Sequence, residues 1–309
     1  MKQKSEVMKT FLAALLLLAS IFGLPASADA ADKIKAVASF SILGDMVKQV
    51  GGDRVDVVTL VGPDGDAHVY EPTPMDLKRV SEAKVIITNG LGLEGWITRL
   101  IDASGTEAQI AEASKGVVPR TFTAEEAGEG QGVVDPHAFQ SVGNARIYVN
   151  NISAALCAAD EKDCQAFKDN ASAYIARLNS LETEVKESIG KISPEKRRVI
   201  TSHDAFGYFA HAYGLTFLAP EGVSTEAEAS AADVVKIVQQ IREQKASALF
   251  VENISDPRLI EQIGRETGLK VSGVLFSDAL SPKDGPAATY IDMMRHNVRT
   301  ILEAINQGS

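Results

Sequence analysis

The sequence predicts an α/β protein of two lobes, each built on a four-stranded, mainly parallel sheet that is flanked by helices. Three observations predict this fold. Short β-rich runs alternate with helical stretches, the candidate strands fall into two sets of four, and one long helical stretch separates the two sets. Strands that are apolar on both faces and alternate with helices are typical of parallel sheets.

Residues 1–30 have the pattern of a secretory signal peptide and are set apart from the fold. Lys2, Lys4 and Lys9 precede the apolar run Phe11–Leu24, and small residues follow as far as Ala30. The apolar run is too short to span a bilayer comfortably. No cysteine follows it that would carry a lipid. We therefore expect cleavage near residues 28–30 and a periplasmic mature protein.

The first lobe is expected to occupy residues 31–162. Its apolar runs predict strands at Ile34–Phe40, Val55–Val61, Lys84–Thr88 and Gln109–Ala113, with helices at Ile42–Val50 and Pro74–Glu82. The segment Thr121–Val134 is acidic and poor in bulky residues, which indicates a mobile surface loop.

A long helix is predicted over residues 163–192. Its apolar positions recur every three or four residues and form one stripe: Phe167, Ala171, Tyr174, Leu178, Leu181, Val185 and Ile189. Ser193-Pro194 ends the pattern. We expect this helix to join the two lobes rigidly, although an ordinary packing helix inside one domain would show the same stripe.

The second lobe is expected to occupy residues 193–309. Strands are predicted at Arg198–Thr201, Thr216–Ala219, Ala248–Val251 and Val271–Leu275, and helices at Phe206–His211, Ala231–Gln244, Asp256–Thr267 and Ala287–Ile305.

The composition excludes several classes of protein. The chain has 309 residues, of which 45% are apolar and 23% charged, so it is neither disordered, collagenous nor a multi-spanning membrane protein. Removing residues 1–30 takes away three lysines and two acids, which changes the net charge from −10 to −11. The negative electrostatic field of such a protein repels nucleic acid and anionic lipid, but it is compatible with binding a cation.

The two cysteines of the chain, Cys157 and Cys164, are predicted to form a disulfide, because an exported protein meets an oxidising compartment. A metal-binding pair is the alternative. It is disfavoured because no histidine lies near the pair.

Three histidines and one aspartate follow predicted strands, where parallel sheets place their ligands. His68 lies in the Gly- and Pro-rich loop after Val61, His137 follows Asp135-Pro136, His203 follows the strand ending at Thr201, and Asp278 follows the last strand. Three imidazoles and one carboxylate form a ligand set suited to tetrahedral Zn²⁺. Each residue taken singly also has an ordinary structural interpretation, so it is their joint pattern that predicts a metal site.

The two remaining histidines are not expected to bind the metal. His211 lies eight residues after His203 on a predicted helix, about 12 Å along the axis. His296 lies between Arg295 and Arg299 on the C-terminal helix, where a polar surface is the expected environment.

Several motifs resemble one family over essentially the whole mature chain. They are Gly65–Pro74 (GDAHVYEPTP), Asn89–Trp96 (NGLGLEGW), Asp135–His137 (DPH), Thr201–Phe209 (TSHDAFGYF), Ser224–Ser230 (STEAEAS), Glu266–Gly268 (ETG) and Leu275–Ser281 (LFSDALS). In these the chain resembles the zinc- and manganese-binding solute-binding proteins of bacterial ATP-driven metal importers, the ZnuA/TroA type. Val117–Val134 contains no histidine, so the chain looks closer to the AztC-like subgroup, which lacks a histidine-rich loop.

The resemblance implies a metal bound between the lobes by His68, His137, His203 and Asp278, and its delivery to an ABC permease in the inner membrane. Manganese-preferring relatives usually have a carboxylate where His203 stands, so Zn²⁺ is expected, with Mn²⁺ as the alternative. Glu252 and Asp204 are candidates for orienting the imidazoles. A periplasmic metallochaperone is a further candidate partner, and we expect a monomer.

Two functions other than metal transport are considered. A metal-sequestering protein or an adhesin would use the same site. A zinc hydrolase is disfavoured because a fourth protein ligand leaves no position for a reactive water, and the chain contains neither HExxH nor GxSxG. We therefore do not expect an enzyme.

Overall fold

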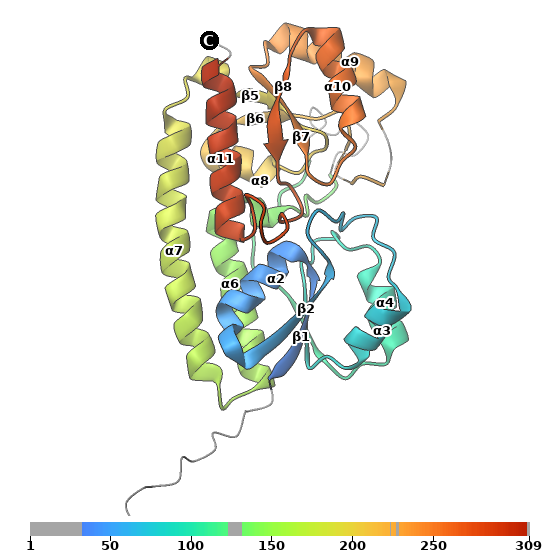
Figure 1. The fold of residues 1–309 in the computed structure, drawn as a ribbon, viewed down its shortest axis with the longest axis vertical. Coiled ribbons are helices and arrows are strands. Elements are labelled where there is room, and N and C mark those ends of the chain that lie inside the picture. Colours follow the sequence, from blue (N-terminus) through green and yellow to red (C-terminus); the bar gives the residue numbers. More distant parts are fainter. Residues whose placement is uncertain (1–32, 123–131, 223, 227–228, 308–309) are drawn as a thin grey trace, which may run out of the picture. The chain divides into compact units, whose positions relative to one another are not determined.

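Two four-stranded sheets organise the computed structural model, which describes residues 33–122, 132–222, 224–226 and 229–307 (Figure 1). Their strand orders are β2-β1-β3-β4 and β6-β5-β7-β8, and every pairing is parallel. The predicted fold class is confirmed, with sheets that are wholly rather than mainly parallel. The predicted signal peptide and residues 123–131 of the predicted Thr121–Val134 loop lie outside the described residues.

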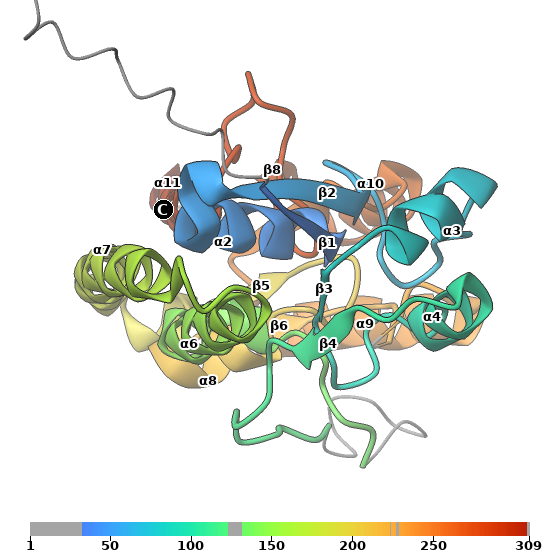
Figure 2. The same cartoon turned by 90° about the horizontal axis from the view of Figure 1, so that it is seen from below.

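The elements around the first sheet follow one another as β1 (Ile34–Phe40), α2 (Ser41–Gly51), η2 (Gly52–Arg54), β2 (Val55–Val61), α3 (Pro74–Ser81), β3 (Val85–Thr88), α4 (Ile97–Ser104), β4 (Gln109–Glu112) and η4 (Ala138–Gln140). Helix α3 begins where the sequence specifies it, because Thr73 and Asp76 form a reciprocal capping box. Helices α2 and α6 (Val142–Ala159) lie on one side of this sheet, and α3 and α4 lie on the other (Figure 2).

The second sheet is built from η5 (Pro194–Lys196), β5 (Arg198–Ile200), α8 (Gly207–Tyr213), β6 (Thr216–Leu218), α9 (Ala231–Gln244), β7 (Ala248–Glu252), α10 (Pro257–Thr267), β8 (Val271–Leu275) and α11 (Tyr290–Gln307). Ser230 and Asp233 form a capping box at the start of α9. Asp256 caps α10, whose first residue is Pro257.

Helix α7 (Cys164–Gly190) is the long helix that the apolar stripe predicts. Its buried residues are the predicted ones: Phe167, Ala171, Tyr174, Leu178, Leu181, Val185 and Ile189. The helix contacts α2 and α6 beside the first sheet and α8 and α11 beside the second (Figure 1). Two helices, α4 and α6, lie where the sequence analysis predicted none.

One hydrophobic core runs from the first sheet through α6, α7 and α11 to the second sheet, and it includes Phe40, Tyr148, Leu178, Phe250 and Tyr290. A smaller cluster lies under α9 and α10. The apolar stripe of α7 is buried in this shared core, so the helix packs against both halves of the structure. No helix of the described residues has the length and apolarity that a membrane crossing requires.

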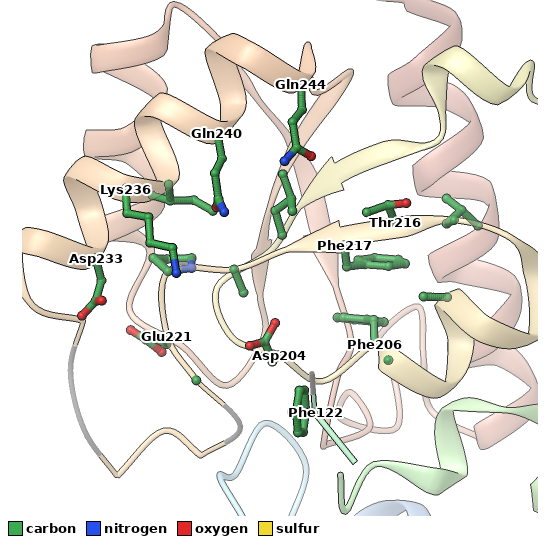
Figure 3. A pocket seen from close by; sticks show the side chains of 18 of the residues that line it. Phe122, Asp204, Phe206, Thr216, Phe217, Glu221, Asp233, Lys236, Gln240 and Gln244 are labelled. Atoms are coloured by element: carbon green, nitrogen blue, oxygen red, sulfur yellow. The ribbon is translucent and has the colours of Figure 1, made fainter. Parts of the chain in front are cut away.

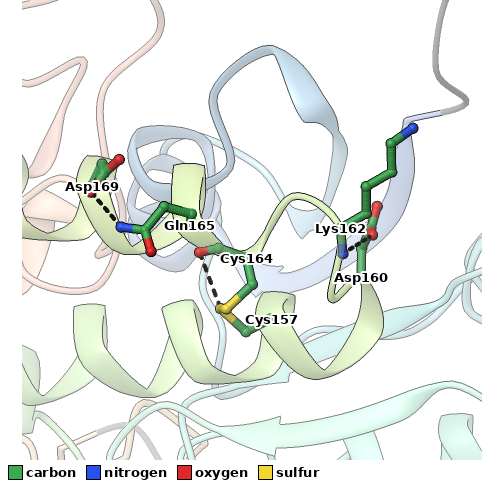
Figure 4. The surroundings of a disulfide bond; sticks show 6 residues. All are labelled: Cys157, Asp160, Lys162, Cys164, Gln165 and Asp169. Carbon is green, nitrogen blue, oxygen red and sulfur yellow. Dashed lines mark hydrogen bonds between the residues drawn. A yellow bond between two sulfur atoms is a disulfide. The ribbon is translucent and has the colours of Figure 1, made fainter.

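Cys157 and Cys164 form a disulfide across the turn between α6 and α7 (Figure 4). By restricting the unfolded chain, a bridge that closes so short a loop contributes about 2–3 kcal/mol. It stabilises the helical hairpin that packs against the first sheet.

Candidate metal centre

The structure brings the four predicted residues together. One ligand atom from each of His68, His137, His203 and Asp278 lies within 4.8 Å of the others, and all four side chains are buried. His68 follows β2, His137 follows β4, His203 follows β5 and Asp278 follows β8. The site therefore lies where the carboxyl ends of strands from both sheets meet, as expected for ligand sites in parallel sheets.

The separations between these atoms fit a bound cation. The Nε2 atoms of His68 and His137 are 3.2 Å apart. Asp278 Oδ2 is 3.1 Å from Nε2 of both His68 and His203, and 3.5 Å from Nε2 of His137. Four ligands at about 2.0–2.1 Å in a tetrahedron lie about 3.3–3.4 Å from one another. The donor set and these four distances are compatible with a tetrahedral cation.

Asp278 has a further free acceptor. Its Oδ1 is buried and has no hydrogen-bond partner among the described residues. A buried carboxylate oxygen without a partner is costly, and a cation in the site would lower that cost.

His68 is held on a rigid loop. Its backbone N–H donates to Asp66 Oδ1 at 2.8 Å, and Thr225 Oγ1 donates to Asp66 Oδ2 at 2.5 Å. The Trp96 indole N–H donates to the Ala67 carbonyl at 2.8 Å. The loop is therefore tied both to its own half and to the segment that precedes α9.

His137 is oriented by Asp135, a partner that the sequence analysis missed. Asp135 Oδ1 lies 2.8 Å from His137 Nδ1 and also accepts the His137 backbone N–H at 3.0 Å. A carboxylate at Nδ1 leaves Nε2 as the donor atom for a metal. Asn89 Nδ2 donates to the Pro136 carbonyl at 2.9 Å and so fixes the turn. The aspartate of the Asp135-Pro136-His137 motif was the available signal.

His203 lies beside Glu252, one of the two candidates for orienting an imidazole. Glu252 Oε2 lies 2.6 Å from His203 Nδ1, and Oε1 accepts the backbone N–H groups of Ser202 and His203 at 2.7 and 2.9 Å. The other candidate, Asp204, instead lines a cavity of about 520 Å³ beside β6 and α9 (Figure 3).

Burial and neighbouring charges strongly shift the pKa values of the ionisable groups in the cluster. Burial lowers the pKa of His137, but the carboxylates of Asp278 and Asp135 outweigh it and raise that pKa to about 9. Burial likewise opposes the raised pKa of His203, which Glu252 and Asp278 hold well above its ordinary value. Burial favours a neutral Asp278, yet His137 and His203 hold its pKa well below the usual range.

Metal binding is expected to strengthen as the pH rises toward 9. Below that value His137 is protonated, and only the neutral imidazole binds a metal, so the ion must displace a proton. Calorimetric titration at pH 7 in buffers of different ionisation enthalpy should show release of at least one proton per ion. An affinity that stays constant between about pH 6 and 8 would contradict this expectation.

The two remaining histidines lie outside the site, as predicted. His211 is exposed on α8. His296 on α11 has its Nε2 3.0 Å from the Val274 carbonyl oxygen, and its ring packs edge-on against Phe276.

The strand ends of two parallel sheets thus converge on a buried cluster of three histidines and one aspartate that could hold a metal ion. A family model described as "Zinc-uptake complex component A periplasmic" matches residues 36–304. The chain belongs to this family, whose members are the substrate-binding components of ABC metal importers rather than enzymes.

Named relatives cover nearly the full chain. The chain is 32% identical over 309 residues to the iron ABC transporter substrate-binding lipoprotein MtsA of Streptococcus pyogenes serotype M1, covering 98% of this chain and 99% of the relative. It is 31% identical over 315 residues to the manganese ABC transporter substrate-binding lipoprotein PsaA of Streptococcus pneumoniae, covering 99% and 100%.

Solved structures share the fold. The Mn-bound S38A mutant of a periplasmic metal-binding protein from Candidatus Liberibacter asiaticus is 31% identical, with a TM-score of 0.81, covering 89% of this chain and all of that one. The periplasmic zinc-binding protein TroA of Treponema pallidum is 28% identical, with a TM-score of 0.83, covering 88% and 99%.

Proposed function

We propose that the protein captures one Zn²⁺ ion in the periplasm with His68, His137, His203 and Asp278, and delivers it to an ABC permease in the inner membrane. The observation that carries this proposal is the buried cluster of three imidazoles and one carboxylate, with donor atoms at separations suited to a tetrahedral ion.

The ligand types favour zinc over manganese. Imidazole-rich sites suit Zn²⁺, whereas Mn²⁺ prefers more oxygen ligands, and the affinity order for a given site also places zinc above manganese. Binding of Mn²⁺ or Fe²⁺ is the second candidate, because relatives of this chain are named for manganese and for iron. Metal sequestration without a permease is a further alternative.

The proposed function also assigns roles to the N-terminal segment, the two lobes and the partners of the protein. Residues 1–30 would direct export, and residues 31–162 and 193–309 would form two lobes joined by the helix over residues 163–192. The shared core supports a firm connection between those lobes. We propose that the protein acts as a monomer with a membrane permease and its ATPase, and that a periplasmic metallochaperone is a candidate donor.

Titration of metal-free protein tests the proposed metal. Calorimetry with Zn²⁺ should give a stoichiometry of one ion per mature chain, and competition should show Zn²⁺ displacing Mn²⁺ at equal concentrations. A stoichiometry of zero or two would contradict the proposed site. Tighter binding of Mn²⁺ or Fe²⁺ would keep the site and replace the metal.

A further inference from the structure

The carboxylate of Asp135 has two separate tasks. Its Oδ1 accepts from the ring and the backbone of His137, while its Oδ2 accepts from Arg120 Nη1 at 3.1 Å. Asp135 is fully buried, so the direction of its carboxylate depends on these partners. Arg120 therefore acts on the oxygen that does not face His137.

The backbone places Arg120 opposite Asp135. The Asp135 N–H donates to the Arg120 carbonyl at 2.8 Å, and Thr121 and Val134 form an antiparallel bridge next to it. The Arg120 guanidinium also lies 5.1 Å from the centre of the Phe122 ring. The ion pair is thus supported by paired backbone and by an aromatic face.

The other half of the molecule closes over this ion pair. A Cβ atom on Gly207, the first residue of α8, would lie 2.4 Å from Arg120 Nη1 and 2.5 Å from Asp135 Oδ2. The next residue, Tyr208, accepts the Arg120 backbone N–H on its hydroxyl at 2.8 Å. The absence of a side chain at position 207 allows α8 to pack directly on the pair.

We propose that Arg120 is a positioning residue for metal capture. It holds the Asp135 carboxylate in the orientation that keeps His137 Nε2 directed at the metal, and contacts from α8 make this arrangement depend on both halves of the molecule. This inference rests on the proposed function. Without the guanidinium, Asp135 Oδ2 would lose its charged partner inside the protein, and the contacts of Oδ1 with His137 would have to hold the carboxylate.

Two substitutions at Arg120 test its charge separately from its packing. Arg120→Met keeps an apolar stem over Phe122 and removes the charge, and it should weaken Zn²⁺ binding about tenfold in chelator competition. Arg120→Lys keeps the charge and should recover most of that loss. Arg120→Gln is a second neutral variant should Arg120→Met fail to fold.

The control is Arg146→Met, which removes a guanidinium that donates to Asn179 on α7 and to the Gly143 carbonyl, neither of which is a proposed metal ligand. It should leave Zn²⁺ affinity unchanged. Wild-type affinity in the folded neutral variants at position 120 would overturn the proposal.

A double-mutant cycle with Asp135→Asn identifies the route of the effect. If Arg120 acts through Asp135, then Arg120→Met should cause no further loss in the Asp135→Asn background. An equal tenfold loss in both backgrounds would overturn the positioning role, because a general structural defect would add independently. Wild-type protein that binds no Zn²⁺ would instead contradict the proposed function itself.

Discussion

Replacing His203 with alanine is expected to lower the affinity for Zn²⁺ by more than 100-fold. Loss of a partner that merely orients a metal ligand typically costs about 10–100-fold, and His203 would be a ligand itself. The substitution would also leave Glu252 buried without the imidazole that lies 2.6 Å from it. Chelator competition on metal-free protein measures the change.

His211→Ala is the matched control for this experiment. His211 lies eight positions further along the chain and is exposed on α8, so its removal should leave affinity within about twofold of wild type. Equal losses in the two variants would show that the division of the histidines between site and surface is wrong.

Replacing Leu178 with alanine is expected to lower the free energy of unfolding by about 2–5 kcal/mol. Leu178 is fully buried at the middle of α7, within the core that joins both sheets. The cavity left behind would weaken packing shared by the two halves. Urea denaturation should therefore show one cooperative transition shifted to lower denaturant.

Glu187→Ala, at an exposed position of the same helix, should change the unfolding free energy by less than about 0.5 kcal/mol. Two separate transitions, only one of which responds to Leu178→Ala, would contradict the description of α7 as a rigid element common to both halves. An unchanged urea midpoint for Leu178→Ala would contradict the burial of Leu178.

Much of the fold can be predicted from the sequence, because apolar runs and helical spacing are local patterns that indicate strands and helices. The strands of both sheets are short apolar runs, and the stripe from Phe167 to Ile189 has helical spacing that the structure reproduces residue by residue. Helix α6 was missed, although its buried residues have helical spacing from Val142 through Tyr148 and Ile152 to Leu156. Its asparagines and β-branched residues have low helix propensity, which weakens the local signal. Its burial comes from packing against α7.

Within the candidate site, the sequence by itself determined the donor types, because residue types and the apolar strands that precede them are local features. Neighbouring glycines or prolines also indicated a rigid setting for His68 and His137. Tertiary structure alone decided that His68 and Asp278, 210 residues apart, lie 3.1 Å from each other. It also placed Arg120 on Asp135 and Gly207 against both of them. Such contacts arise only when the two sheets and their helices pack together on one shared core, and no local pattern encodes that geometry.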